Sequence, residues 1–123
     1  MSDTADKFRA LIVKLFDRTL ERKLKWTLEQ SSGLLFCEMS DFVVRLSSTR
    51  TASNEPLEKI EVVDALGQTL DLFYDTTVSG KVPPRSGYTT YYDLMKELRL
   101  QARRQAIGAD SALDRILRSL DES

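Results

Sequence analysis

Histidine is absent from this 123-residue chain, and cysteine occurs once, at Cys37. Without histidine the chain has no Ser–His or Cys–His nucleophile pair, no imidazole base and no histidine-containing metal site. One cysteine excludes an internal disulfide, a cysteine-rich zinc site and a Cys-x-x-Cys redox motif, and it favours a reducing cytoplasm. An enzyme would have to use carboxylates, lysine, tyrosine or a hard cation. We therefore expect a protein that is not an enzyme and carries no cofactor.

Long apolar runs and an excess of one charge sign are also missing. Arg9 and Lys14 interrupt the most apolar segment, FRALIVKLF, so we expect no membrane span. The start, MSDTADKF, is acidic and polar, unlike the basic and then apolar start of a signal peptide. Residues 1–61 carry 10 basic and 10 acidic side chains, and residues 62–123 carry 8 and 9. Such balance creates no overall field that would attract nucleic acid.

The remaining composition, 41% apolar and 30% charged, is typical of a globular protein, and we expect one domain over residues 1–123. Residues 5–24 have apolar side chains at i, i+3, i+4 and i+7 spacing, which predicts an amphipathic helix. Its expected core stripe consists of Phe8, Leu11, Ile12, Leu15, Phe16, Leu20 and Leu24.

The hydrophobic period then changes from helical to alternating. Residues 35–47 alternate on both sides of a Ser40–Asp41 corner, which predicts a hairpin with one buried face. A polar loop at 48–56 precedes a second predicted hairpin, whose strands are expected at 58–63 and 68–74. Four strands without a crossover helix predict an antiparallel meander. The expected core residues of the first hairpin are Leu35, Cys37, Met39, Phe42, Val44 and Leu46.

The C-terminal part is predicted to be helical after a surface connection at residues 76–90. Thr90 and Asp93 resemble a capping box, and Gly108 is typical of a residue that ends a helix. Asp110 is expected to cap a short final helix with apolar residues at helical spacing, namely Leu113, Ile116, Leu117 and Leu120. The predicted fold class is α+β: a helix, a four-stranded antiparallel meander, a helix and a short final helix.

Three sequence features can be compared with those of known proteins. A basic–Leu–x–Trp run at Lys23–Trp26 follows the threonine Thr19, a D-x-x-G-x-x-x-D pattern spans Asp64–Asp71, and ARRQAIGADSALDRIL occupies Ala102–Leu117. In these features the chain resembles, over roughly residues 8 to 120, small bacterial cytoplasmic proteins of unknown function. It departs from their pattern in lacking a tyrosine near Arg99 and in carrying Lys23 in place of a glycine. The resemblance implies the fold and a bacterial cytoplasmic setting, and it implies no activity.

Two basic stripes are candidate sites for phosphates or an acidic partner. Interleaved acidic residues, Asp17, Glu21 and Glu97, favour instead a solvated helix face. No glycine-rich phosphate loop and no RNA-binding aromatic signature accompanies the stripes. The basic residues are Lys14, Arg18, Arg22 and Lys25 in the first helix and Lys96, Arg99, Arg103 and Arg104 in the second.

Several carboxylates lie around the second predicted hairpin, at Glu61, Asp64, Asp71 and Asp75. Such a group can hold a hard cation or act as an acid–base pair, but aspartate at hairpin turns also binds its own backbone. Cys37 lies on the expected core face, where a buried structural cysteine is the usual finding.

Aromatic residues supply candidates for a protein interface. Trp26 is expected to pack over the end of the sheet or to contact a partner. The 80–92 segment holds Arg85, Tyr88, Tyr91 and Tyr92, which either form a binding loop or fold back over the sheet. If the helices cover one sheet face only, an apolar patch on the other face would suit self-association. Its expected members are Phe36, Val43, Val63 and Phe73.

Three functional hypotheses follow. The leading one is a non-catalytic protein-interaction or regulatory domain that binds another protein or a second copy of itself. The second is nucleic-acid binding through the basic helix faces. The third is a small-ligand site or carboxylate enzyme between the sheet and the 76–90 segment, near Asp71, Asp75 or Tyr88.

Overall fold

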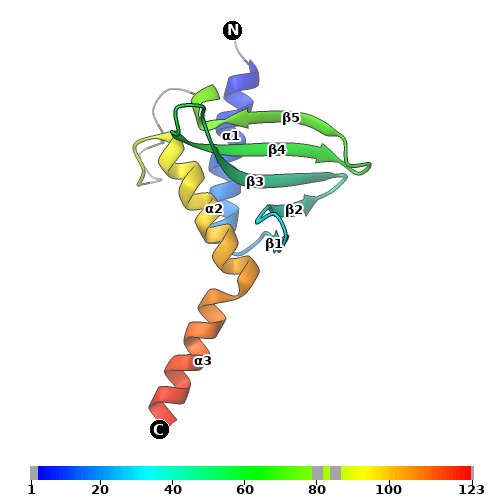
Figure 1. Cartoon of the computed structure of the whole chain (residues 1–123). Helices are drawn as coiled ribbons and strands as arrows, with labels where there is room; N and C mark the ends of the chain where they lie inside the picture. The colour runs from blue at the N-terminus through cyan, green and yellow to red at the C-terminus, as the bar shows by residue number, and fades with distance from the viewer. Residues whose placement is uncertain (1–2, 79–81, 84–86, 123) are drawn as a thin grey trace.

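The computed structural model describes residues 3–78, 82–83 and 87–122. The chain is an α+β protein in which a helix precedes an antiparallel sheet and two helices follow it (Figure 1). The elements are α1 Asp3–Leu20, β1 Thr27–Leu28, β2 Leu35–Met39, β3 Phe42–Arg50, β4 Pro56–Asp64, β5 Thr69–Tyr74, the 3₁₀ turn η1 Asp75–Thr77, α2 Tyr91–Ile107 and α3 Ala109–Glu122.

The five strands form one antiparallel sheet in the order β1-β2-β3-β4-β5. The antiparallel meander is thus confirmed, but the expected number of strands, four, is wrong. The additional strand β1 has only two residues, which pair with Leu35 and Phe36 of β2. The predicted 48–56 loop is also too long, because β3 and β4 stay paired as far as Arg50 and Pro56.

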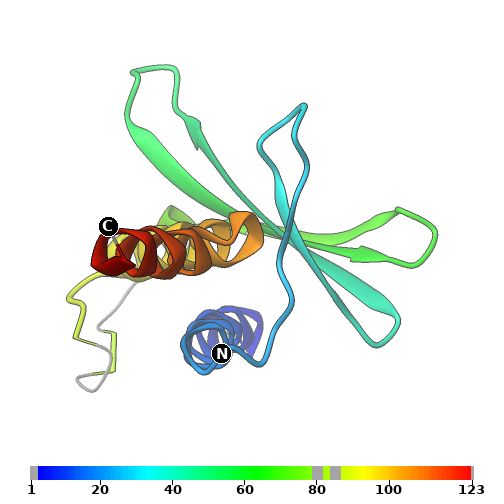
Figure 2. The ribbon, with the colours of Figure 1, turned by 90° about the horizontal axis from the view of Figure 1, so that it is seen from below.

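Helices α1 and α2 lie against one face of this sheet, and the other face carries no helix in the described chain (Figure 2). The core lies between these two layers, because the inward residues of the strands meet the apolar stripes of both helices. It includes Ile12, Leu15, Phe16, Trp26, Leu35, Cys37, Val44, Leu46, Ile60, Phe73, Val78, Val82, Tyr91, Leu94, Met95, Leu98 and Ala102.

Two expected core positions on the first hairpin are less covered than predicted. Met39 is half-buried at the end of β2, and Phe42, its partner in the register, is exposed. This pair closes the β2–β3 turn, which extends beyond the helix layer.

The predicted exposure of Val63 and the predicted outward position of Phe73 require correction. Phe73 pairs with Ile60 and faces the helices, where its ring stacks on Phe8 with centroids 4.0 Å apart. Val63 pairs with Val43 on the outer face, yet it is only 1% exposed. A register shift between Val62 and Val63 changes the pairing of β4 with β5 at this point.

The first helix ends earlier than predicted, at Leu20 rather than near residue 24. Arg22 has a positive φ of 59°, which breaks the helical path. Consequently Leu20 is exposed and Leu24 is only half-buried. No helix among the described residues is long and apolar enough to cross a membrane.

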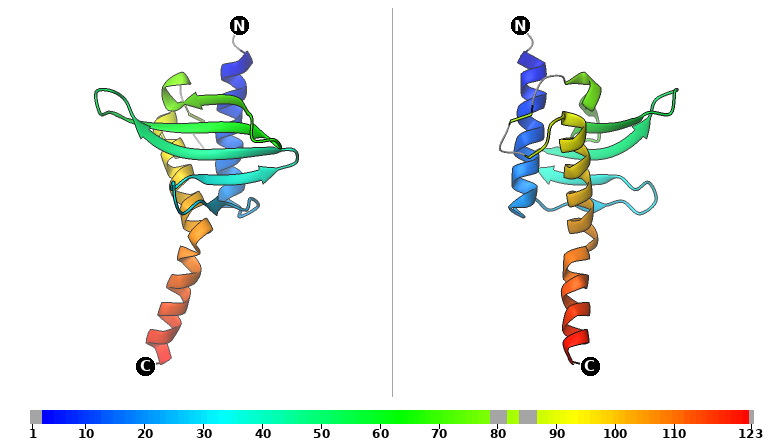
Figure 3. Two further views of the ribbon diagram at one scale, coloured as in Figure 1. Left: turned by 45° about the vertical axis from the view of Figure 1, so that its right-hand side comes forward. Right: turned by 90° about the vertical axis from the view of Figure 1, so that its left-hand side faces the viewer.

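Both ends of α2 are capped by the residues predicted from the sequence. Thr90 is the N-cap, and its hydroxyl accepts a hydrogen bond from the Asp93 backbone N–H at 3.1 Å. Gly108 ends the helix in the left-handed conformation, with φ 70°. The final helix is longer than expected, with 14 residues, and it begins at Ala109, so that Asp110 lies inside its first turn rather than before it. It extends from the end of α2 away from the sheet and α1 (Figures 1 and 3).

Candidate functional site: the projecting helix α3

Helix α3 has a pronounced apolar face that nothing in the described chain covers. No residue of α3 is buried, and Leu113, Ile116, Leu117 and Leu120 are between 50% and 64% exposed. Their spacing places all four on one side of the helix. Two views in Figure 3 show α3 clear of the remaining elements. Apolar residues scattered singly on a surface are ordinary, whereas four adjacent ones on one helix indicate a contact surface.

A shallow, open depression on α3 itself borders this apolar face. Four of its lining residues, Ala112, Arg115, Ile116 and Ser119, are spaced i, i+3, i+4 and i+7. This spacing is the one that forms a hole for a side chain of an opposing helix. The small side chains of Ala112 and Ser119 leave the space into which such a side chain would fit.

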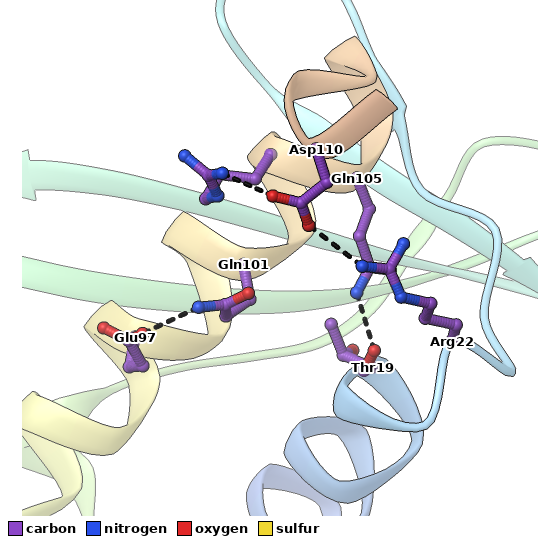
Figure 4. Close-up of polar contacts among 7 residues, drawn as sticks. Thr19, Arg22, Glu97, Gln101, Gln105 and Asp110 are labelled. Atoms are coloured by element: carbon purple, nitrogen blue, oxygen red, sulfur yellow. Dashed lines mark hydrogen bonds and ion pairs between the residues drawn. The ribbon is translucent and has the colours of Figure 1, made fainter. Parts of the chain in front are cut away.

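The base of α3 is held against α1 and α2 by polar contacts (Figure 4). The carboxylate of Asp110 accepts hydrogen bonds from Arg22 at 2.9 Å and from Arg104. Nearby, Gln105 donates to the backbone carbonyl of Thr19 at 2.7 Å, which joins the ends of α1 and α2. The hydrogen bond from Arg104, followed by that from Arg22, lowers the pKa of Asp110 below its ordinary value. The two contacts of Asp110 join the first turn of α3 to Arg104 near the end of α2 and to Arg22 just after α1.

The apolar spacing of α3 was predicted from the sequence, but the exposure of its apolar face was not. The signal that was available is the break at Gly108, which separates α3 from a helix that already covers the sheet.

The aromatic interface candidates lie mostly inside the protein. Trp26 is buried, and its indole N–H donates to the Thr19 hydroxyl at 3.0 Å. Tyr91 is buried in the core, and the half-buried Tyr88 meets the ring of Phe16 edge-on at 5.6 Å. Burial, and then the charge of Glu97, raises the pKa of Tyr88. The core covers the side chains of Trp26 and Tyr91, as the packing alternatives expected, so that neither side chain is exposed on the surface of the described chain.

Two further candidates of the 80–92 segment have different outcomes. Tyr92 is half-buried beside the β3–β4 hairpin, and Arg85 lies outside the described residues.

The outer face of the sheet is less apolar than predicted. Phe36 and Val43 are half-buried there and line a hollow of about 230 Å³ whose other lining residues include Glu29, Glu38 and Arg45. Because Val63 is buried and Phe73 faces the helices, only two of the four expected residues contribute to an accessible patch. Two apolar residues of β5, Leu70 and Leu72, are also exposed, which was not predicted from the sequence.

The predicted basic stripe of the first helix is interrupted and partly neutralised, because α1 ends at Leu20 and both Arg22 and Lys25 lie beyond it. Arg18 pairs with Glu21 at 2.8 Å, and Arg22 pairs with Asp110 at 2.9 Å. Lys14 is exposed on α1, beside Asp17 and Arg18 in a shallow hollow that carries both charge signs. Such a face provides little net field for nucleic acid.

The basic stripe of α2 is divided in the same way. Arg99 pairs with Glu58 at 2.7 Å and Arg104 pairs with Asp110, whereas Lys96 and Arg103 are exposed. Two of the four basic side chains of this stripe thus form ion pairs within the chain.

The candidate carboxylates make local hydrogen bonds. Asp64 accepts from the backbone N–H groups of Leu66 and Gln68 in the β4–β5 turn, and Asp75 accepts from that of Glu58 at 2.8 Å. Asp71 accepts from the next backbone N–H, and Glu61 accepts from the Thr69 hydroxyl. Among the residues that the structure describes, no three Cys, Asp or Glu side chains are grouped to hold a metal ion.

Cys37 is buried in the core, as predicted. Burial raises the pKa of its thiol, an effect to which the charge of Glu38 adds and which a hydrogen bond with the Lys25 backbone opposes. A buried thiol of raised pKa is a weak nucleophile at neutral pH.

Comparisons with protein-family models, with curated proteins and with solved structures gave no significant match. The most distinctive surface of the described chain is the uncovered apolar face of α3.

Proposed function

We propose that this chain is a non-catalytic interaction domain that associates with a second copy of itself through α3. The observation that carries the proposal is the apolar stripe of α3, which has four large side chains at least half exposed. A bacterial cytoplasmic setting, suggested by the single buried cysteine and by the sequence resemblance, is part of the same proposal.

The shape of α3 supports a second α3 as the occupant. One helix carries both protruding side chains, Leu113, Leu117 and Leu120, and the hole bordered by Ala112 and Ser119. Two copies can therefore fill each other's holes, as in a two-fold symmetric contact where the same patch serves on both sides.

The stripe also fits an antiparallel pair. With Leu113 of one copy over Leu120 of the other, Leu117 of each copy lies opposite Ile116 of its partner, so that the four apolar residues of both stripes are covered. Because α3 projects from the body, such a contact leaves the two bodies at opposite ends.

The size of the contact predicts moderate affinity. Fourteen residues of helix extend about 21 Å, so the interface is smaller than the roughly 1,600 Å² of a typical stable complex. We expect association in the micromolar range or weaker.

Sedimentation equilibrium over concentrations from about micromolar to about millimolar tests the proposal. We expect a monomer–dimer equilibrium that Leu117→Glu shifts toward monomer by at least about tenfold in dissociation constant, because a charge would be buried at the contact. The matched control is Ser111→Glu, which adds the same charge on the opposite side of α3 and should leave the equilibrium unchanged.

A protein that stays monomeric at all concentrations would contradict the proposal, as would a Leu117→Glu variant that dimerises like the parent.

A further inference from the structure

A polar hollow of about 310 Å³ lies between the β3–β4 hairpin and the first turns of α2. The β3–β4 register pairs Ser48 with Glu58, two residues beyond the core pair of Leu46 with Ile60. The hollow therefore lies on the helix side of the sheet, immediately beyond the apolar core. The lining residues used below are Ser48, Arg50, Glu58, Tyr92, Lys96 and Arg99.

A buried ion pair forms one wall of this hollow. The Glu58 side chain is 4% exposed, and its two oxygens accept from Nε and Nη2 of Arg99 at 2.7 and 3.1 Å. A buried carboxylate is costly unless it is paired in this way. The double contact fixes the plane of the guanidinium and leaves Nη1 of Arg99 as its remaining donor nitrogen.

Two more cations line the hollow without a carboxylate partner in the described part of the chain. Lys96 makes no ion pair there. Arg50 donates from Nη1 to the backbone carbonyl of Asn54 at 2.9 Å, a contact that positions the side chain without neutralising it. Asp75 binds the Glu58 backbone but is not among the lining residues. The hollow is thus lined by three cationic side chains and one carboxylate, and that carboxylate is already paired with Arg99.

From this arrangement we infer that the hollow binds the phosphate group of a small phosphate monoester. The guanidinium of Arg50 at the end of β3, the ammonium of Lys96 and the guanidinium of Arg99 on α2, with the hydroxyls of Ser48 and Tyr92, form a donor set suited to a tetrahedral anion. A phosphate monoester carries close to two negative charges at neutral pH and three terminal oxygens that accept hydrogen bonds. The Arg99–Glu58 pair acts here as a positioning device, because it holds one donor in place before the ligand arrives.

The volume favours one phosphate group over a polyanion. It lies at the lower end of the roughly 300–1,000 Å³ found for small-molecule sites. The next cation on the same helix, Arg103, lies one turn further along α2 and does not line the hollow, so the cations that line the hollow do not continue along α2 as contacts to a nucleic-acid backbone would. The site uses no residue of α3, and its test is therefore independent of the proposed self-association.

Isothermal titration calorimetry with O-phosphoserine, inorganic phosphate and serine, at low ionic strength, tests the inference. We expect saturable binding of one O-phosphoserine per chain, none of serine, and NMR shifts at the amides of 48–50 and 92–99. Lys96→Met should weaken O-phosphoserine binding by at least about tenfold, because it removes a charge-assisted contact. Lys96 is exposed, so the variant is expected to fold.

The matched control is Arg103→Gln, which removes the same charge from an exposed position of α2 outside the hollow. Unchanged affinity in this control, with loss in Lys96→Met, supports the site. Absence of saturable binding, or equal losses in both variants, would overturn the inference. Binding of inorganic phosphate with no binding of O-phosphoserine would overturn the monoester assignment. A single-stranded oligonucleotide that binds more tightly than O-phosphoserine and loses affinity in both variants would show a nucleic-acid surface in place of this site.

Discussion

Helices α2 and α3 follow one another across Gly108, and both have an apolar stripe, yet α2 buries five residues and α3 buries none. The difference lies in what faces each stripe. The stripe of α2 meets the sheet and α1, whereas the stripe of α3 begins where the sheet ends. An amphipathic pattern therefore identifies a helix face that must be buried. Which element of the chain or which partner buries that face depends on the tertiary structure.

The largest expected difference between the two helices concerns truncation of a leucine. Leu98→Ala in α2 should lower the free energy of unfolding by about 2–5 kcal/mol, because Leu98 is fully buried and the change leaves a cavity. Leu117→Ala in α3 should change it by less than about 0.5 kcal/mol at protein concentrations where the chain is monomeric. Urea unfolding of both variants measures the difference. Equal losses in the two variants would show that α3 packs against the body in solution.

A substitution at Gly108, between the two helices, is expected to have a smaller effect on the free energy of unfolding. Gly108→Ala should destabilise the protein by about 1 kcal/mol, because a side chain in the left-handed conformation is strained. A Cβ at this position meets no atom within 4 Å, so the expected cost comes from the backbone alone. The control is Gly108→Asn, since asparagine tolerates this conformation better, and it should lose less in the same unfolding experiment. A stabilised Gly108→Ala variant would indicate that α2 and α3 prefer to join as one continuous helix.

The smallest expected effect concerns pH at the same boundary. The pKa of Asp110 is lower in the folded chain than in the unfolded one, because Arg104 and Arg22 bind its carboxylate. Its contribution to stability is therefore complete above the unfolded value of about pH 3.9 and is lost as the pH falls through the lower folded value. The difference in unfolding free energy between the parent and Asp110→Asn should be small at pH 6 and should vanish in stronger acid. Asp114→Asn controls for the loss of one negative charge at pH 6, and a difference that grows in acid would contradict the prediction.

Much of the fold was predictable because local patterns agree with it. Alternation located β2 and β3, the capping residue Thr90 located the start of α2, and Gly108 located its end. The strand β1 was missed because two residues, Thr27 and Leu28, are too few to show alternation.

The errors on β4 and β5 have a different cause. Phe73 was assigned to the outer face, although its pairing with Ile60 turns it toward the helices and leaves Leu70 and Leu72 outside. Which of two apolar sets on a strand faces the core depends on register with the neighbouring strand, and the shift between Val62 and Val63 makes that register harder to infer.

The candidate sites were less predictable than the fold. Basic residues in a helical stripe look equivalent in the sequence, but Arg99 is fixed by Glu58, 41 residues away, and Arg22 by Asp110, 88 residues away. Only the folded chain distinguishes the cations that are paired from Lys96 and Arg103. The exposed face of α3 was likewise invisible, since its spacing is the same as that of a helix in a core.

The length of α3 has a consequence for how two copies would act together. A pair joined only along two antiparallel projecting helices would hold its two bodies apart, and with them the two copies of the polar hollow, and would leave both hollows accessible. Such a dimer could bind two sites on one target at once, and its affinity for that target would then exceed the affinity of a single copy.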